Sequence, residues 1–329
     1  MRLLLGLLVL MLCAGCESLS YYGQAISGHF RLLAAARPID TWLADPATPA
    51  ELKNRLETAR RIREFASKNL HLPDNGSYLS YADLGRRFAV WNVFAASEFS
   101  VEPRQECFPF TGCVSYRGFF SEAEAERHAA RLRAQGYDVY VGGVLAYSTL
   151  GWFDDPLLST FIRYPEAQVA RLVFHELAHQ AVYAKNDTTF NESFAVVVEE
   201  EGVRRWLEAE GRGEELAAFH AAQARKRELA ARIMETRERL KGIYAMKLSR
   251  EQMLEQKRGE FQRLRAAFPF VPAEPNNAFL VSIALYNELV PAFERLLAEA
   301  GSLERFYDRA RQLAASERSS RDPLLAQRQ

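Results

Sequence analysis

The sequence predicts a mainly helical protein with a small β-sheet, which is an α+β fold. Apolar residues recur every three or four positions in residues 48–70 and 214–268, as in amphipathic helices. Two segments rich in Val, Phe, Trp and Tyr, residues 88–101 and 137–149, are instead typical of strands. A chain of 329 residues, of which 48% are hydrophobic, is long enough and apolar enough to bury a core of this kind.

The first part of the chain is expected to hold a helix, a turn and a strand. The helix is predicted to begin at Thr48-Pro49, because proline is favoured in the first helical turn. The Pro-Asp-Asn-Gly run at residues 73–76 predicts a turn. Residues 88–101 alternate only weakly between apolar and polar, but their composition favours a strand.

A cysteine loop separates this strand from the next elements. Residues 114–120 are predicted to form a short strand. Residues 121–136 are expected to form a helix that opens on a Ser-x-x-Glu capping box, Ser121 with Glu124, and ends at a glycine. His128 lies on this helix among charged neighbours, so we expect a solvated surface side chain there and not a metal ligand.

The last third of the chain is strongly helical. Residues 214–268 mix both signs of charge with apolar residues at helical spacing, which predicts a long solvated helical hairpin. Residues 276–301 are predicted to begin another buried helix, and residues 316–329 form a polar tail. Lys+Arg and Asp+Glu both total 42, so the composition gives no support to nucleic-acid binding, which favours a basic excess.

The N-terminus has the layout of an export signal. Residues 1–15 contain one arginine, a short apolar run and small residues, and the run is too short for a permanent transmembrane helix. The Ala-Gly-Cys sequence ending at Cys16 is similar to a bacterial lipobox, whose cysteine carries lipid, although Cys13 stands where leucine is usual. Glu17 favours sorting to the outer membrane. We expect a signal peptide, then a lipid-anchored tether over residues 16–36; an ordinary signal peptide is the alternative.

Two further cysteines are expected to pair. Cys107 and Cys113 flank a short stretch whose Pro109 and Gly112 favour a tight loop. In an oxidising periplasm these cysteines are predicted to form a disulfide. A zinc role is less favoured, because no second cysteine pair exists to complete a tetrahedral site.

The sequence from His175 through Glu176 to His179 has the order His-Glu-x-x-His, which indicates chemistry. On a helix the two histidines project from one face about one turn apart, where two imidazoles can bind one zinc ion. Glu176 lies about a third of a turn from His175, so it can reach a metal-bound water without binding the metal. The ion would acidify this water and the carboxylate would remove its proton.

The flanking residues place this motif on an interior helix. Residues 169–182 are apolar almost all round, Pro165 favours a helix start, and Asn186-Asp187 favours its end. The alternative is a pair of core histidines that bond to their neighbours. We favour zinc, because burying two imidazoles and a carboxylate on adjacent turns without a metal is costly.

A third protein ligand is expected at Glu192. It lies near the start of a second apolar helix, and a short turn at residues 185–188 would fold that helix antiparallel to the first. The alternative is a capping box of Thr189 with Glu192, which by itself would account for the glutamate. Glu199, two turns further on the same face, is expected to orient a histidine N–H.

The same motifs carry a resemblance to a known family. HELAHQ followed by FNESFA, with CFPFTGCVSYRGFF and AYSTLGWFDDPL upstream, resembles the predicted zinc aminopeptidase family of proteobacterial lipoproteins. The similarity extends from about Tyr21 to the NNAFLVSIALYNELVPAF segment. It implies a zincin-like, gluzincin-like peptidase over residues 37–315, with one zinc ion on the three ligands named above and Glu176 as general base and acid.

In a zincin, an edge strand beside the metal helix pairs with the substrate backbone. Gly142-Gly143 and the strand through Val144 to Tyr147 are placed in sequence for this, with an ordinary core strand as the alternative. Residues 152–155, Trp-Phe-Asp-Asp, could line a substrate pocket, and an acidic residue there could receive a free amino terminus.

A tetrahedral oxyanion needs a hydrogen-bond donor besides zinc. Tyr147, Tyr183 and Tyr286 are the candidates. Tyr286 has the order along the chain seen in other gluzincins, after the glutamate ligand, and a buried core tyrosine is the alternative.

The sequence thus predicts a lipid-anchored, periplasm-facing zinc peptidase that acts on peptides, most simply an aminopeptidase. One alternative keeps zinc but makes the protein an endopeptidase or a hydrolase of cell-wall peptides. The other is a non-catalytic scaffold in which zinc only stabilises the fold. Glu176 argues against a scaffold, because a structural site has no use for an acid–base group.

Overall fold

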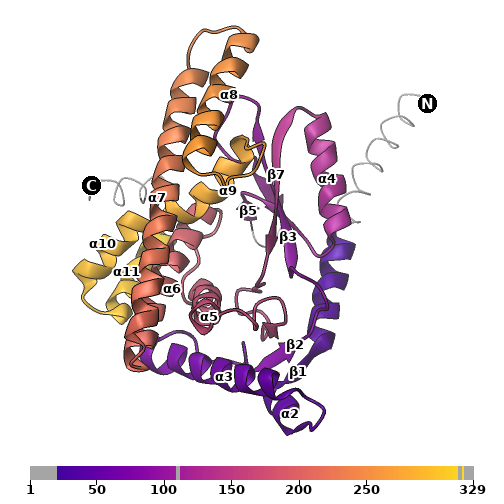
Figure 1. Ribbon diagram of the computed structural model, residues 1–329, viewed down its shortest axis with the longest axis vertical. Coiled ribbons are helices and arrows are strands. Elements are labelled where there is room, and N and C mark those ends of the chain that lie inside the picture. The colour runs from indigo at the N-terminus through magenta and orange to yellow at the C-terminus, as the bar shows by residue number, and fades with distance from the viewer. Residues whose placement is uncertain (1–20, 109–111, 318–320, 322–329) are drawn as a thin grey trace, which may run out of the picture.

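The computed structural model describes residues 21–108, 112–317 and Arg321. This part of the chain is mainly helical and carries three small sheets (Figure 1), which confirms the predicted α+β class. The predicted signal peptide, residues 1–15, and the predicted lipidation site Cys16 lie outside the described residues, as does most of the polar tail. None of the described helices is both long and apolar enough to cross a membrane.

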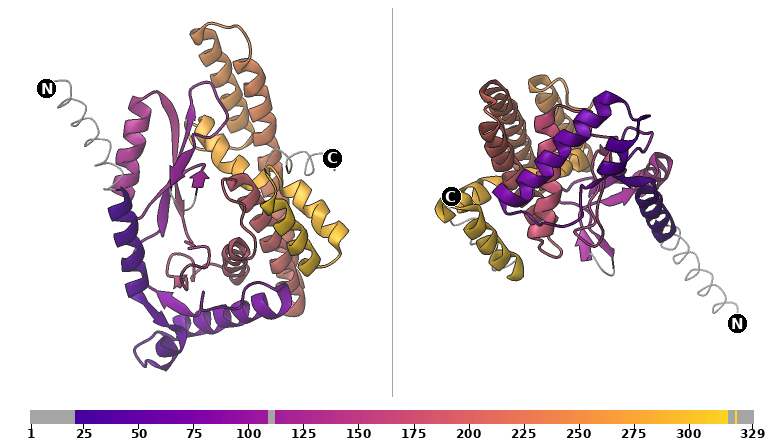
Figure 2. Two further views of the ribbon diagram at one scale, coloured as in Figure 1. Left: turned by 180° about the vertical axis from the view of Figure 1, so that it is seen from behind. Right: turned by 90° about the horizontal axis from the view of Figure 1, so that it is seen from below.

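The N-terminal segments form helices along two sides of the molecule. Residues 21–35, within the segment expected to be a tether, are helical, and Leu32 is buried in the main core. The short helix α2 (Ile39–Ala44) precedes α3 (Ala50–Leu70), which begins directly after Pro49 as predicted. The helix at residues 21–35 and α4 lie on one side of the molecule, and α10 and α11 lie on the other (Figures 1 and 2).

The largest antiparallel sheet has the strand order β6-β3-β7. Its strands are β6 (Arg117–Phe119), β3 (Val90–Ser97) and β7 (Tyr137–Val144). Trp91, Val93 and Ala95 pack with residues of α4 (Glu122–Ala134) on one face, whereas Phe94 and Ala96 pack with residues of α9 (Asn277–Asn287) on the other. Because helices cover both faces, β3 is buried along nearly its whole length, and its sequence alternates only weakly.

Two smaller sheets complete the β-structure. One has the order β1-β2-β8, formed by β1 (Ala36–Pro38), β2 (Ser80–Ala82) and β8 (Leu157–Leu158). The other is a hairpin of β4 (Glu106–Phe108) and β5 (Gly112–Val114). Cys107 and Cys113 face each other across this hairpin and form a disulfide, as predicted.

The helices α5 (Glu166–Ala181) and α6 (Thr188–Ala209) form the centre of the protein. They run antiparallel, because Glu166 at the start of α5 accepts a hydrogen bond from Trp206 near the end of α6. Gly202 allows a close approach of α6 to its neighbours: a Cβ there would lie 2.6 Å from the ring of Phe174 and 2.9 Å from Leu70. Since the two helices are antiparallel, the chain reverses direction between Ala181 and Thr188, as predicted.

The charged segment forms the predicted hairpin, α7 (Gly213–Tyr244) and α8 (Arg250–Ala267), and the end at which the two helices connect projects beyond the rest of the molecule (Figure 1). The hairpin is not solvated all round, because Ile233, Leu240 and Leu264 are buried in a second hydrophobic cluster with residues of α9. The C-terminal helices α10 (Val290–Ala300) and α11 (Leu303–Ala315) follow.

Three local predictions are wrong. His128 is 4% exposed and its ring packs against Phe119, because the sheet covers this face of α4. Ser121 is the N-cap of α4, but its side chain makes no capping hydrogen bond. α5 ends at Ala181, several residues before the predicted stop, because the chain becomes extended at Val182.

Candidate metal centre

The helix α5 presents its two motif histidines toward α6. His175 and His179 are both buried, and their Nε2 atoms lie 3.2 Å apart. Glu192 on α6 places its Oε2 atom 3.2 Å from Nε2 of His175 and 3.6 Å from Nε2 of His179. The three residues predicted as ligands therefore meet at one buried point between the helices.

The spacing of these atoms fits a tetrahedral metal ion. Ligand atoms about 2.0–2.1 Å from zinc at tetrahedral angles lie about 3.3–3.4 Å from one another, close to the distances observed. Imidazole nitrogens and a carboxylate oxygen also carry lone pairs, and they converge at low cost only when a cation or shared protons lie between them. The group formed by His175, His179 and Glu192 can therefore hold a metal ion.

The start of α6 decides against a capping role for Glu192. Asp187 is the N-cap of this helix, and its carboxylate accepts a hydrogen bond of 3.0 Å from the backbone N–H of Phe190. Thr189 lies inside the helix, so the alternative of a capping box with Glu192 is wrong. The carboxylate of Glu192 is instead free to face the two histidines.

Glu199 contacts the ring nitrogen of His175 that does not face Glu192, as expected for a residue that orients a histidine. Its Oε2 lies 2.8 Å from Nδ1 of His175, and its Oε1 accepts a hydrogen bond of 2.9 Å from Arg171. Because Nδ1 faces Glu199, Nε2 of His175 is directed toward Glu192 and His179. Nδ1 of His179 is buried without a hydrogen-bond partner among the described residues.

The charges of this group are strongly coupled. Burial opposes the ionisation of Glu192, but the imidazoles of His179 and His175 outweigh it and lower the pKa of Glu192 to about 2. Burial also opposes the charged form of His175, and its hydrogen bonds with Glu192 and Glu199 raise its pKa to about 10. Burial raises the pKa of Glu176 above its ordinary value, while the two histidines oppose this shift.

A cavity of about 430 Å³ opens onto the metal group, and Glu176 lines it beside His175 and His179. The volume is within the usual range of small-ligand pockets. The three tyrosines predicted as oxyanion donors, Tyr147, Tyr183 and Tyr286, line it too. Three further tyrosines also line it: Tyr21, Tyr22 and Tyr116. Tyr286 stacks on His175, with ring centroids 6.3 Å apart.

Residues 20–325 match the model of the family described as Putative aminopeptidase. The chain belongs to this aminopeptidase family. Among the curated proteins no match was found, and among solved structures none was found either.

The turn between α5 and α6 is held by the side chain of Asn191. The side chain of Asn191 accepts a hydrogen bond from the N–H of Ala184 at 2.7 Å and donates one to the carbonyl of Ala184 at 2.9 Å. These two bonds fix the chain directly after His179 against the start of α6. They thereby set the position of Glu192 relative to the histidines.

Tyr116 is a cavity residue that the sequence analysis of this aminopeptidase-family chain missed. It follows the disulfide hairpin, which docks on the same turn: Asn186 Oδ1 accepts from the N–H of Cys113 at 2.7 Å, and Thr188 Oγ1 from that of Ser115 at 3.3 Å. Gly112 has a φ of +76°, and a Cβ there would lie 2.1 Å from Asn186 Oδ1. The closely spaced cysteine pair, with a tyrosine three residues after Cys113, is the signal that could have indicated this residue.

The strand predicted to pair with the substrate backbone lines the cavity only in part. β7 is an edge strand of its sheet, and Val144 and the following Ala146 and Tyr147 line the cavity. Gly142 and Gly143 do not line it, and a Cβ on Gly143 would instead meet the ring of Phe88.

The prediction that residues 152–155 line the substrate pocket is wrong. Trp152 is 80% exposed, and none of the four residues lines the cavity. Asp155 is buried and accepts hydrogen bonds from the backbone N–H and the hydroxyl of Thr149, so it organises its own loop. Burial raises the pKa of Asp155 to about 6.

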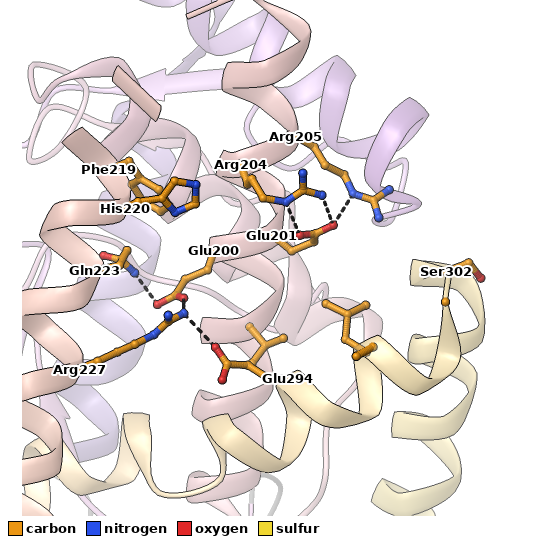
Figure 3. Close-up of a pocket in the computed structure, with 14 residues that line it drawn as sticks. Glu200, Glu201, Arg204, Arg205, Phe219, His220, Gln223, Arg227, Glu294 and Ser302 are labelled. Atoms are coloured by element: carbon orange, nitrogen blue, oxygen red, sulfur yellow. Dashed lines mark hydrogen bonds and ion pairs between the residues drawn. The ribbon is translucent and has the colours of Figure 1, made fainter. Parts of the chain in front are cut away.

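A second cavity, of about 550 Å³, lies between α6, α7 and α10 (Figure 3). Its acidic side chains are paired with arginines: Arg227 bonds both Glu200 and Glu294, and Glu201 bonds Arg204 and Arg205. Gln223 donates a further hydrogen bond to Glu200. Because its charges neutralise one another and it does not contain the metal group, we assign the chemistry of this protein to the other cavity.

Proposed function

We propose that this protein is a zinc-dependent peptidase, and more narrowly an aminopeptidase. The observation that carries the proposal is the convergence of His175, His179 and Glu192 beside Glu176 in one cavity. Membership of the aminopeptidase family supports a peptide substrate. The order of these residues, with the glutamate on a second helix, supports the gluzincin-like arrangement that the sequence resembles.

Each of these residues has a task that its position suits. A bound zinc ion supplies Lewis-acid chemistry, polarising the scissile carbonyl and lowering the pKa of water. Glu176 lines the cavity without belonging to the metal group, and its raised pKa suits a base that accepts a proton from the attacking water. The same carboxyl then donates that proton to the leaving amine.

Two tyrosines that line the cavity would stabilise the developing negative charge. Burial raises the pKa of Tyr286 well above its ordinary value, and the nearby carboxylate of Glu192 raises it further. Tyr286 therefore stays protonated and can donate a hydrogen bond to an oxyanion. Tyr116 has a similarly raised pKa from the same two causes and is the second donor at this end of the cavity.

The N-terminal sequence supports a place in the bacterial cell envelope. A signal peptide over residues 1–15 with lipid on Cys16 would anchor the protein, and Glu17 favours the outer membrane. Radiolabelled palmitate incorporation into the chain and into a Cys16→Ser variant tests this. Lipid on the wild-type chain and none on the variant is expected, whereas equal labelling contradicts the anchor.

A comparison of the chain starting at residue 17 with its Glu176→Gln variant tests the catalytic proposal. Both are measured for bound zinc and for cleavage of peptides with free and with acetylated amino termini. Zinc in both, with cleavage lost at least about 100-fold in the variant, is the expected result. Equal zinc with no cleavage in either would leave the metal a structural role.

The two halves of that peptide set separate the candidate activities. Cleavage of free amino termini alone identifies an aminopeptidase. Of the two carboxylates that line the cavity, Glu192 belongs to the metal group and Glu176 lies beside it, so a substrate amino terminus would rely on neutral side chains such as Asn92 and Ser148. Cleavage of acetylated peptides as fast as that of peptides with free amino termini would identify the second candidate, an endopeptidase or cell-wall peptide hydrolase.

A further inference from the structure

The helix at residues 21–35 forms one wall of the cavity that holds the metal group. Tyr21, Tyr22 and Ala25 of this helix line the cavity together with Phe108 and Phe120. This wall comes from the segment whose sequence indicated a tether leading into a first helix. A molecule bound in this cavity is therefore adjacent to side chains of the first helix.

The helix is held in place by specific contacts along one face. The side chain of Gln24 accepts a hydrogen bond of 3.1 Å from the backbone N–H of Phe120. Gly28 lies directly against the Phe120 ring, because a Cβ there would be 2.3 Å from Cγ of the phenylalanine. The ring of His29 packs on Phe153, with centroids 4.6 Å apart, and Leu32 is 2% exposed. The wall is therefore docked and not a loose segment.

The two tyrosines of this wall differ in their freedom. Tyr21 stacks on Phe108, touches Phe119 edge-on, and lies under the guanidinium of Arg117 at 4.5 Å. The ring of Tyr22 meets those of Tyr21 and Phe108 in edge-on arrangements, and the residue is 36% exposed. Tyr22 thus keeps exposed ring surface where it lines the cavity.

The remaining lining is also apolar or uncharged. Besides Glu176 and the metal group, the described lining residues include no charged side chain, and aliphatic residues such as Val90, Val144 and Leu150 accompany the aromatic ones. A charged substrate side chain would lose its hydration here without gaining an opposite charge. An aromatic or large aliphatic side chain would instead gain contact area and edge or stacking contacts with the rings.

We propose that Tyr22, backed by Tyr21 and Phe108, is a specificity-determining residue that selects peptides with a large apolar or aromatic residue next to the scissile bond. This inference rests on the proposed function, because it assigns the substrate class of the same metal site. It predicts discrimination against lysine and glutamate in that position. It also assigns a role in substrate selection to the segment that directly follows the predicted lipid anchor.

Binding of phosphinic dipeptides to the zinc-loaded full chain in detergent tests this inference without requiring turnover. Phe, Leu, Ala, Lys or Glu is placed on either side of the phosphinate, with Ala on the other side, and affinities are measured by calorimetry. In at least one position, the Phe and Leu compounds are expected to bind about tenfold tighter than the Ala, Lys and Glu compounds.

Variants of the first helix assign this preference to Tyr22. Tyr22→Ala is expected to weaken the Phe compound about 3- to 10-fold while the Ala compound changes less than about twofold, and Tyr22→Phe is expected to keep the preference. Phe30→Ala removes a ring of the same helix that is 58% exposed and outside the cavity, so it should change neither affinity.

Two failures are distinguishable. Zinc binding with equal affinity for all five side chains in both positions, or an equal loss for all compounds in Tyr22→Ala, overturns this inference and leaves the peptidase proposal standing. Failure of the chain to bind zinc overturns the proposed function and this inference with it.

Discussion

At the scale of single residues, the contacts of Glu199 orient the metal group. Its carboxylate lies 2.8 Å from Nδ1 of His175 and also accepts from Arg171. Burial opposes the ionisation of Glu199, but Arg171 and His175 outweigh it and lower its pKa to about 2. The carboxylate is therefore charged at neutral pH and fixes the imidazole with Nε2 toward the metal position.

We expect Glu199→Gln to weaken zinc binding about 10- to 100-fold, because the loss of the charge removes this orientation. Glu200→Gln is the matched control, since the neighbouring glutamate lines the other cavity and bonds Arg227 (Figure 3). Competition with a chromophoric chelator measures both affinities. The same zinc affinity in both variants would show that Glu199 does not orient His175.

Tyr286 is the tyrosine whose ring stacks on His175, and we expect Tyr286→Phe to lower kcat about 100-fold or more while zinc stays bound. KM should change little, because the hydroxyl acts on charge that develops only in the transition state. Steady-state kinetics with a peptide cleaved by the wild-type chain measures both constants.

Tyr140→Phe is the control for this experiment, because Tyr140 packs between hydrophobic clusters and does not line the cavity. A large loss of kcat in Tyr116→Phe together with normal turnover in Tyr286→Phe would transfer the donor role to Tyr116. This would also explain why the disulfide hairpin docks beside the metal helices.

At the scale of elements, the close packing of α6 on α5 and α3 depends on Gly202. A methyl group there would lie 2.6 Å from the ring of Phe174 and 2.9 Å from Leu70. We expect Gly202→Ala to lower the free energy of unfolding by about 1–3 kcal/mol, because a packed core has no room to relax. Urea unfolding followed by circular dichroism measures the change.

Gly242→Ala gives the opposite expectation for the same substitution. Gly242 lies in α7 with no atom within 4 Å of an added Cβ, so alanine should leave stability unchanged or raise it by up to about 1 kcal/mol. If both variants unfold at the same urea concentration as wild type, α6 has more room than the contacts of Gly202 indicate.

At the scale of the whole molecule, the metal group joins the two helices around which the other elements pack. A ligand that binds only the folded state stabilises it, by about 4 kcal/mol when its concentration is about 1,000 times Kd. For a chain of this length we therefore expect chelation of zinc to lower Tm by roughly 6 °C. Calorimetric scans with zinc and with chelator measure the shift.

Two variants make this measurement specific. Glu176→Gln should keep the zinc-dependent shift, because Glu176 lies outside the metal group. Glu192→Gln should lose most of it, because an amide oxygen is a poorer zinc ligand than a carboxylate. A shift that persists in Glu192→Gln would mean that zinc stabilises the protein at another position.

Much of the candidate site was predictable because it depends on local spacing. The helical period brings His175 and His179 to one face, and that same period puts Glu176 beside them. The disulfide was predictable because Cys107 and Cys113 are only six positions apart and the residues between them favour a tight loop. The apolar composition of residues 169–182 likewise predicted an interior helix.

Two of the errors concern residues whose surroundings come from distant parts of the chain. His128 is buried because the sheet covers its face of α4, and the charged neighbours in sequence gave no sign of this. Trp152 is exposed, although the aromatic and acidic composition of residues 152–155 is typical of a substrate pocket. The lining contributed by Tyr22 and Tyr116 depends on where the first helix and the disulfide hairpin dock.

The sequence by itself determined the α+β class, the histidine pair with its glutamate, and the cysteine loop, because each follows from residues within a few turns of one another. Only the tertiary structure decided that Glu192 faces the histidines while Asp187 caps α6, that Glu199 and Arg171 support His175, and that the first helix lines the cavity. These arrangements arise from the packing of elements far apart in sequence, which no local period encodes.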